Sequence, residues 1–197
     1  MKSGIFYAVG VGTEPMDLTL RAKQILEQAD VIVKPVRQIG AFSVAYTIAA
    51  KAVNLEKKET LELVFPMQVQ ADYRNRLQDG CLQPICNYLE AGKNVAMVTL
   101  GDVSIYSTAT YVRQVLAEKG YETNVIAGIL SFSVGAAKAK CSLCENQESL
   151  VVLPAVTDQA EVETVLEQFN TLVLMKAGRA LSWLIPMLAE KQLLSHT

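Results

Sequence analysis

The strongest fold signal in the chain is Val95-Ala96-Met97-Val98-Thr99-Leu100-Gly101-Asp102-Val103-Ser104-Ile105-Tyr106-Ser107-Thr108. A short apolar run ends in Gly-Asp, and a segment rich in hydroxyl side chains then leads into an amphipathic run that stops at Gly120. Such an order is typical of a buried strand that feeds a helix through a tight turn. We therefore predict a strand over 95–100 and a helix over 106–119.

The same alternation of strands and helices extends in both directions from this stretch. Before it, we expect strands at 5–12, 31–33 (stopped by Pro35) and 61–65, and helices at 18–29, 41–53 and 70–91. After it, we expect strands at 122–126, 150–153 and 171–176, and helices at 131–139, 158–168 and 180–190. This alternation predicts an α/β fold with mixed or parallel sheets flanked by helices. We place a domain junction near residue 120, between an N-terminal α/β domain (1–120) and a C-terminal α/β domain (121–197).

Composition narrows the class of protein. Of the 197 residues, 51% are hydrophobic and 19% are charged, and the net charge is −2. A charge this close to neutral gives no electrostatic reason to expect nucleic acid or an anionic membrane as a partner. No apolar run reaches the roughly 20 residues that span a bilayer, and the first residues lack the pattern of a signal peptide. We therefore expect a cytoplasmic protein.

The cysteines and the single histidine bear on metal and acid–base chemistry. Cys141 and Cys144 form a C-x-x-C pair, which is compatible with half a zinc site or a redox pair. A tetrahedral zinc site needs four ligands, and the remaining cysteines, Cys81 and Cys86, lie in a distant predicted helix. We expect reduced cysteines and no metal. Because the only histidine is His196, a Ser-His-Asp arrangement is also disfavoured.

The first glycine loop, Val9-Gly10-Val11-Gly12, follows a predicted strand as a dinucleotide-binding loop would. The third glycine of that motif would fall on Pro15, and Asp30 precedes the second strand instead of following it. A nicotinamide enzyme is therefore disfavoured. A tight structural turn and a loop that faces a ligand both remain open.

The Gly101-Asp102 turn also has two readings. Ligands bind beyond the carboxyl ends of strands in open α/β sheets, so the backbone N–H groups and the Asp102 carboxylate are placed to meet a zwitterionic amino-acid group. The alternative is a helix cap supplied by Asp102 or Ser104. Two later segments, 128–133 and 175–179, read individually as tight packing and as a solvated strand end.

Taken in order along the chain, these segments resemble the tetrapyrrole (corrin and porphyrin) methylase family over essentially the whole sequence. The resemblance rests on Gly10-Val11-Gly12, Ala29-Asp30-Val31-Ile32-Val33, Leu100-Gly101-Asp102-Val103, Gly128-Ile129-Leu130-Ser131-Phe132-Ser133 and Leu174-Met175-Lys176-Ala177-Gly178-Arg179. Within the family, the stretch 101–108 and the Met-Lys-x-Gly-Arg segment are most similar to the branch that methylates C-20 of precorrin-2. The loop Thr13-Glu14-Pro15 departs from the family pattern and is shorter.

The resemblance implies a two-domain fold with S-adenosyl-L-methionine in the cleft between the domains, and a homodimer. Carried onto this sequence, cofactor contacts fall on Leu100, Gly101, Asp102, Ile105, Ser107, Thr108, Leu130, Ser131, Met175, Lys176 and Ala177. The first loop, with Gly10, Gly12 and Thr13, would face the tetrapyrrole. Because that substrate carries many carboxylates, Lys34 and Arg37 are further candidates for substrate binding, together with Lys138, Lys140 and Arg179.

The expected function is methyl transfer from S-adenosyl-L-methionine to C-20 of precorrin-2 or cobalt-factor II in cobalamin biosynthesis. No residue is assigned as catalytic, because an electron-rich tetrapyrrole carbon needs orientation and exclusion of water more than an enzyme nucleophile. One alternative is methylation at another position of the macrocycle. The other is a non-catalytic binding form, since the family continues past residue 197 and the second domain is expected to lack its closing strands.

Overall fold

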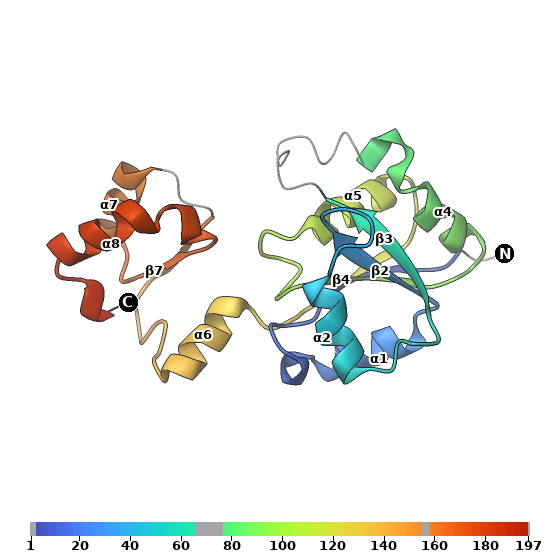
Figure 1. The fold of residues 1–197 in the computed structure, drawn as a ribbon, viewed down its shortest axis with the longest axis horizontal. Coiled ribbons are helices and arrows are strands. Elements are labelled where there is room, and N and C mark those ends of the chain that lie inside the picture. Colours follow the sequence, from blue (N-terminus) through green and yellow to red (C-terminus); the bar gives the residue numbers. More distant parts are fainter. Residues whose placement is uncertain (1–2, 66–76, 155–157, 197) are drawn as a thin grey trace. The chain divides into compact units, whose positions relative to one another are not determined.

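The computed structural model describes residues 3–65, 77–154 and 158–196. The chain divides into two compact units, Met1–Val134 and Gly135–Thr197. Figure 1 shows both units as ribbons. Each unit is described by itself.

The first unit is built on a five-stranded parallel sheet with the strand order β3-β2-β4-β1-β5. Its strands are β1 (Phe6–Gly10), β2 (Val31–Val36), β3 (Glu59–Val64), β4 (Val95–Thr99) and β5 (Thr123–Ile126). Every residue of β4 is buried, as expected for a central strand of a sheet that is covered on both faces. Because all strands run in one direction, their carboxyl ends meet at one edge of the sheet.

Helices cover both faces of this sheet (Figure 1). They are η1 (Pro15–Asp17), α1 (Leu20–Gln28), α2 (Val44–Ala52), the π-helix η3 (Leu77–Cys81), α4 (Gln83–Glu90) and α5 (Thr108–Glu118). On β4, Val95 and Met97 belong to the core cluster that contains residues of α4 and α5, whereas Ala96 and Val98 belong to the cluster that contains residues of α1 and α2. This alternation follows from the two-residue period of a strand.

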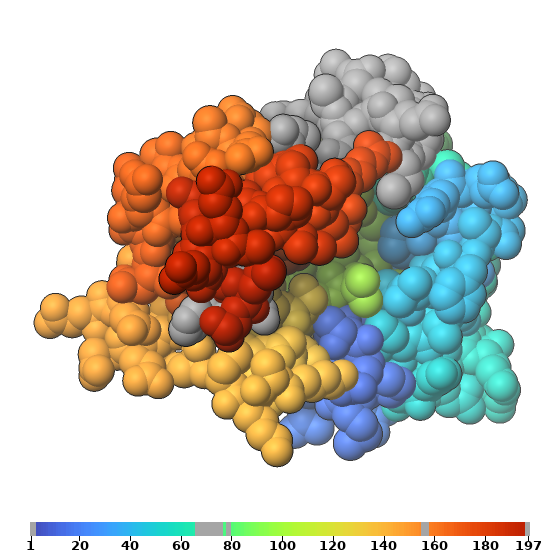
Figure 2. Space-filling model, turned by 60° about the vertical axis from the view of Figure 1, so that its left-hand side comes forward, coloured from blue at the N-terminus to red at the C-terminus, as the bar shows by residue number. Residues whose placement is uncertain are grey.

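The second unit has its own small core. Its sheet consists of β6 (Leu150–Leu153) and β7 (Thr171–Leu174), which pair in parallel. The helices are the greater part of α6 (Ser131–Ala139), then α7 (Gln159–Gln168), η4 (Ala177–Arg179), α8 (Leu181–Glu190) and η5 (Leu194–His196). Val162 of α7 packs with Leu184, Met187 and Leu188 of α8, and these orange and red segments form one continuous body in Figure 2.

The predicted α/β class, with a parallel sheet flanked by helices, is confirmed. The expected junction near residue 120 lies before β5, yet β5 pairs with β1 and so completes the first sheet. The compact units divide later, between Val134 and Gly135. Part of the long helix predicted over 70–91 falls on residues 66–76, outside the described residues. Its described part is the π-helix η3 followed by α4, which has Pro84 in its first turn.

The expectation that Pro35 ends the second strand is wrong, because β2 continues to Val36. Pairing of β2 with β4 stops at Val33, whereas pairing with β3 extends over all six residues. The carbonyl of Val36 accepts from Phe65 N at 2.8 Å, so Val36 faces β3. Successive residues of a strand direct their backbone N–H and C=O groups toward opposite neighbouring strands. Pro35 therefore faces the side where the ladder with β4 has already ended, and its missing N–H removes no bond.

Two leucines of α1 test this packing. Leu26 is fully buried beneath the sheet, whereas Leu20 on the same helix is 87% exposed. We expect Leu26→Ala to lower the free energy of unfolding by about 2–5 kcal/mol, since it leaves a cavity. Leu20→Ala should change it by less than about 0.5 kcal/mol. Urea denaturation followed by circular dichroism measures both, and equal losses would contradict the assignment of the buried face.

Candidate functional site

Loops from three neighbouring strands converge at the carboxyl edge of the first sheet. Gly12, after β1, and Gly101, after β4, exchange backbone hydrogen bonds with N···O distances of 3.1 and 2.8 Å. Both glycines have φ near +70° (70° and 69°), a conformation that side chains with a Cβ rarely adopt. The first glycine loop therefore has the structural role of a turn joined to the loop after β4.

A third loop, which follows β5, packs against the same backbone. A Cβ built on Gly128 would lie 2.1 Å from the carbonyl oxygen of Gly101, and one built on Gly10 would lie 2.7 Å from the same oxygen. Contacts this short do not occur between a real Cβ and backbone. Glycine at both positions is thus a steric requirement for bringing the three strand exits together.

Asp102 links two of these loops through its carboxylate. One oxygen accepts from the backbone N–H of Ser104 at 2.8 Å and from the Ser104 hydroxyl, and the other accepts from the backbone N–H of Gly128 at 2.7 Å. Burial of the side chain, which is 9% exposed, raises the pKa of Asp102. The hydrogen bonds from Ser104 and Gly128 outweigh burial, so the net pKa is lowered and the carboxylate stays ionised.

The helix that follows is capped by Ser107, and not by Asp102 or Ser104. The Ser107 hydroxyl oxygen accepts from Ala109 N at 3.2 Å and shares a buried hydrogen bond of 2.9 Å with the Thr99 hydroxyl. Ser107 thus joins the end of β4 to the start of α5. Ile105 lies in the connecting turn and is half-buried.

The structure brings the first two expected sets of cofactor contacts together. The nearest atoms to a Cβ built on Gly101 are Ile129 O at 3.8 Å and Ser131 N at 4.0 Å, so the buried Gly101 backbone lies next to the start of α6. Leu100 is 51% exposed and Leu130 is half-buried. The loop after β4 and the first residues of α6 are therefore neighbours in the structure.

A hollow of about 250 Å³ adjoins the carboxyl ends of β2, β3 and β4. Its polar residues are Arg37, Ser43, Thr99 and Thr108. Its apolar walls are formed by Pro35, Val36, Phe42, Val44, Ala45, Phe65 and Leu100. The hollow unites Leu100 and Thr108, which were expected near the cofactor, with Arg37, which was expected near the substrate.

Other predicted substrate residues have partners within the chain. Both the N–H and the hydroxyl of Thr13 donate to the Asp17 carboxylate, at 3.0 and 2.6 Å. The ammonium of Lys34 lies 3.2 Å from Glu62 and 5.1 Å from the centre of the Tyr46 ring. Thr13 and Lys34 therefore stabilise local structure, and neither lines the hollow.

The third expected set of cofactor contacts belongs to the second unit. Met175 N donates to Leu153 O at 2.9 Å, and Lys176 adopts a left-handed conformation (φ 58°) just before η4. Ala177 begins η4 and packs against the core of this unit. The cleft between domains that the resemblance implies stays a prediction.

Sequence reasoning missed Ser43 and Phe42. Ser43 immediately precedes α2, where a serine normally predicts a helix cap, yet its side chain makes no capping hydrogen bond. Phe42 is 74% exposed although it is aromatic. No sequence signal separates such a pair from an ordinary helix start.

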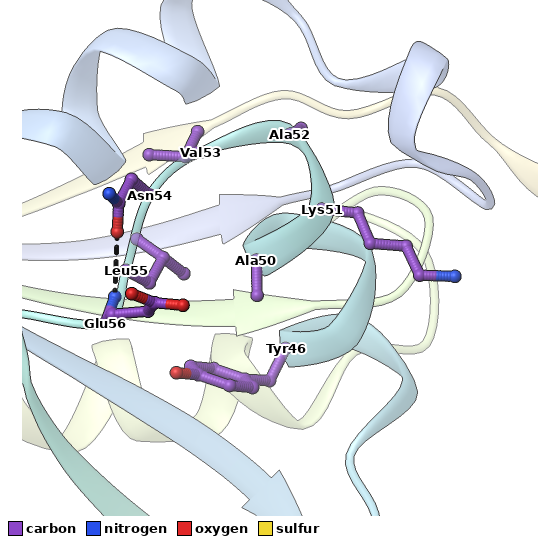
Figure 3. Close-up of a pocket in the computed structure, with 8 residues that line it drawn as sticks. All are labelled: Tyr46, Ala50, Lys51, Ala52, Val53, Asn54, Leu55 and Glu56. Atoms are coloured by element: carbon purple, nitrogen blue, oxygen red, sulfur yellow. Dashed lines mark hydrogen bonds between the residues drawn. The ribbon is translucent and has the colours of Figure 1, made fainter.

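A second hollow, of about 350 Å³, lies at the other end of α2 (Figure 3). It is lined by Tyr46 and by residues 50–56, which lead into the start of β3. Its Asn54 side chain already accepts from Glu56 N at 3.2 Å. Since ligands of parallel sheets bind beyond the carboxyl ends of strands, we place the functional site at the first hollow.

The described residues contain no metal-binding cluster and no membrane-spanning helix. No cluster of three or more His, Cys, Asp or Glu side chains there could hold a metal ion. None of the helices in that part of the chain is both long enough and apolar enough to cross a membrane.

Comparisons with known proteins identify relatives of this chain. A protein of Methanocaldococcus jannaschii named "Probable cobalt-precorrin-2 C(20)-methyltransferase" is 34% identical over 86% of this chain and 71% of its own length. The cobalt-precorrin-2 C(20)-methyltransferase of Salmonella typhimurium is 30% identical over 98% of this chain and 81% of its own length.

Among solved structures, the uroporphyrin III C-methyl transferase of Thermus thermophilus has a TM-score of 0.63 with this chain at 16% identity. The match covers 95% of this chain and 76% of that one, and it shows the shared fold. Residues 6–196 match the family described as Tetrapyrrole (Corrin/Porphyrin) Methylases. This match spans nearly the whole chain, and the chain therefore belongs to the tetrapyrrole methylases.

Proposed function

We propose that this methylase transfers a methyl group from S-adenosyl-L-methionine to C-20 of precorrin-2 or its cobalt-containing counterpart, in cobalamin biosynthesis. The observation that carries the proposal is the similarity to two C(20)-methyltransferases over most of both chains. We further propose that it acts as a homodimer, as the resemblance to the family implies, and that it is cytoplasmic, as expected from the sequence.

The residues around Gly101 fit the amino-acid end of the cofactor. The Gly101 backbone lies beside the start of α6, whose first N–H groups attract a carboxylate. The exposed Leu100 side chain offers an apolar surface next to them. When bound there, the cofactor supplies an electrophilic methyl group on a sulfonium sulfur and leaves as a neutral thioether.

The hollow beside this position fits part of the substrate. Arg37 supplies a cation for a carboxylate, and the apolar walls suit the macrocycle. These walls also exclude water from the reacting groups, and the loops hold the two ligands in one orientation. We assign no general base, because none of the described residues lining the hollow is an Asp, a Glu or a His.

Asp102 acts in this proposal chiefly as a positioning residue. Both of its oxygens already accept hydrogen bonds within the chain, and these bonds hold the loop after β5 against the loop after β4. The start of α6 and the Gly101 backbone keep their spacing through this link. A direct contact between Asp102 and the cofactor stays a prediction.

The position of methylation is tested directly on the product. The purified protein should convert precorrin-2 or its cobalt complex to a product heavier by one methyl group, with the new carbon attached at C-20. Mass spectrometry gives the mass, and NMR with a labelled methyl group gives the position. A methyl group found at another carbon would replace this proposal with a different activity within the family.

Gly101→Ala tests the cofactor position. The new Cβ would occupy the space beside Ile129 O and Ser131 N, so affinity for S-adenosyl-L-methionine should fall by about ten-fold. Gly120→Ala is the matched control, since Gly120 also has positive φ (88°), has open space around it and follows the remote end of α5. Both variants place an alanine at positive φ. Calorimetry that shows equal affinity for the two variants would remove the cofactor from this position.

Asp102→Asn tests the link between the loops. An amide has one acceptor oxygen, so one donor among Ser104 and Gly128 loses its partner, and the free energy of unfolding should fall by about 1–3 kcal/mol. Because the folded-state pKa of Asp102 lies below its ordinary value of 3.8, the carboxylate stabilises the fold above that value. The difference in the free energy of unfolding between Asp102→Asn and the unmodified protein should therefore shrink as pH falls through the folded-state pKa.

The control is Asp30→Asn, which removes a carboxylate that accepts from Asn94 N at 2.8 Å in an exposed position at the start of β2. This change should cost less stability and leave cofactor affinity unaltered. Urea denaturation across a pH series measures both variants. If Asp102→Asn were as stable as the unmodified protein at neutral pH, the link would have no energetic role.

A further inference from the structure

Ser43 presents a buried hydroxyl without a partner. The residue is 8% exposed, and its Oγ has no hydrogen-bond partner within the described residues. It directly precedes α2 but does not cap it. An unpaired buried hydroxyl is unfavourable, so a ligand that offers an acceptor here would satisfy a hydroxyl that the described residues leave unpaired.

The surroundings of this hydroxyl select the chemistry of that group. Ser43 lines the hollow together with Arg37, at the amino-terminal end of a nine-residue helix whose first N–H groups have no partner within the helix. A cation, a hydroxyl donor and the positive end of a helix favour an anion. None of the described residues lining the hollow is acidic, and the walls are largely apolar. The combination fits a carboxylate attached to an apolar skeleton.

The loop that carries these groups is held in place before any ligand binds. The carboxylate of Glu62 on β3 accepts from the Gly40 N–H at 2.7 Å and pairs with Lys34 at 3.2 Å. The hydrogen bond from Gly40 and the one from Lys34 lower the pKa of Glu62, so it stays ionised at neutral pH. Arg37 and Ser43 lie on either side of Gly40 in the sequence, and this link anchors the loop between them.

We propose that Ser43 donates a hydrogen bond to one side-chain carboxylate of the tetrapyrrole bound in the hollow, with Arg37 as its ionic partner. This inference rests on the proposed function, and it adds a residue that sets the rotation of the macrocycle relative to the cofactor. S-Adenosyl-L-methionine also carries a carboxylate. We assign the hollow to the tetrapyrrole, because neither Gly101 nor Ser131 lines it.

Three variants test the proposal with cobalt-precorrin-2 as the probe. Ser43→Ala should weaken its binding by about ten-fold, leave affinity for S-adenosyl-L-methionine unchanged, and leave the melting temperature of the free protein unchanged or higher. Ser43→Thr keeps the hydroxyl and should retain most of the affinity. Thr47→Val is the matched control, since the Thr47 hydroxyl donates to Ser43 O at the start of α2 and Thr47 does not line the hollow. It should lower stability slightly without affecting substrate affinity.

A second probe separates the carboxylate from the rest of the macrocycle. Methyl esterification removes the charge of the carboxylates and leaves weaker acceptors, so the difference in affinity between the unmodified protein and Ser43→Ala should shrink. Equal affinity of both proteins for the free acid, or a loss confined to S-adenosyl-L-methionine, would overturn the role of Ser43. Methylation by the unmodified protein at a carbon other than C-20 would refute only the proposed function, because the binding comparison would still stand.

Discussion

The close approach of three backbone segments at Gly10, Gly101 and Gly128 is the constraint on which the rest of the first unit depends. A Cβ at Gly10 or Gly128 would collide with the Gly101 carbonyl, and the mutual hydrogen bonds of Gly12 and Gly101 need positive φ at both residues. This junction joins the exits of β1, β4 and β5, the strands at one side of the sheet. Asp102 then adds a charged hydrogen bond to Gly128 across the same junction.

The junction divides the carboxyl edge of the sheet into two regions. On one side, the Gly101 backbone lies close to the start of α6, because a glycine at this point places no side chain between them. On the other side, the chain leaving β2 turns around Gly40 to begin α2, and the hollow forms between this loop and Leu100. One region suits a polar amino-acid group, and the other suits a large apolar skeleton with carboxylates.

The chemistry of the family suits such a division. A reaction that joins a reactive methyl donor to an electron-rich carbon needs the two molecules held in line more than it needs acids and bases. The described residues provide positioning through turns. The carboxylates of Glu62 and Asp102 accept hydrogen bonds from backbone N–H groups and so hold loops in place. The ionised side chains near the site thus stabilise the geometry, while Arg37 remains for a ligand.

The sequence by itself determined the α/β class and the order of most strands and helices, because apolar runs of period two and amphipathic runs of period 3.6 are local patterns. It also predicted that the Gly101-Asp102 turn lies at the edge of the sheet where ligands bind, because ligands bind beyond the carboxyl ends of parallel strands. The tertiary structure alone decided what the named residues do. Pro35 is tolerated inside β2 since its neighbour β4 has stopped pairing, and Thr13 and Lys34 are engaged by Asp17 and Glu62. The unpaired hydroxyl of Ser43 emerged only from the packing around it, because burial and hydrogen bonding depend on residues far apart in the chain.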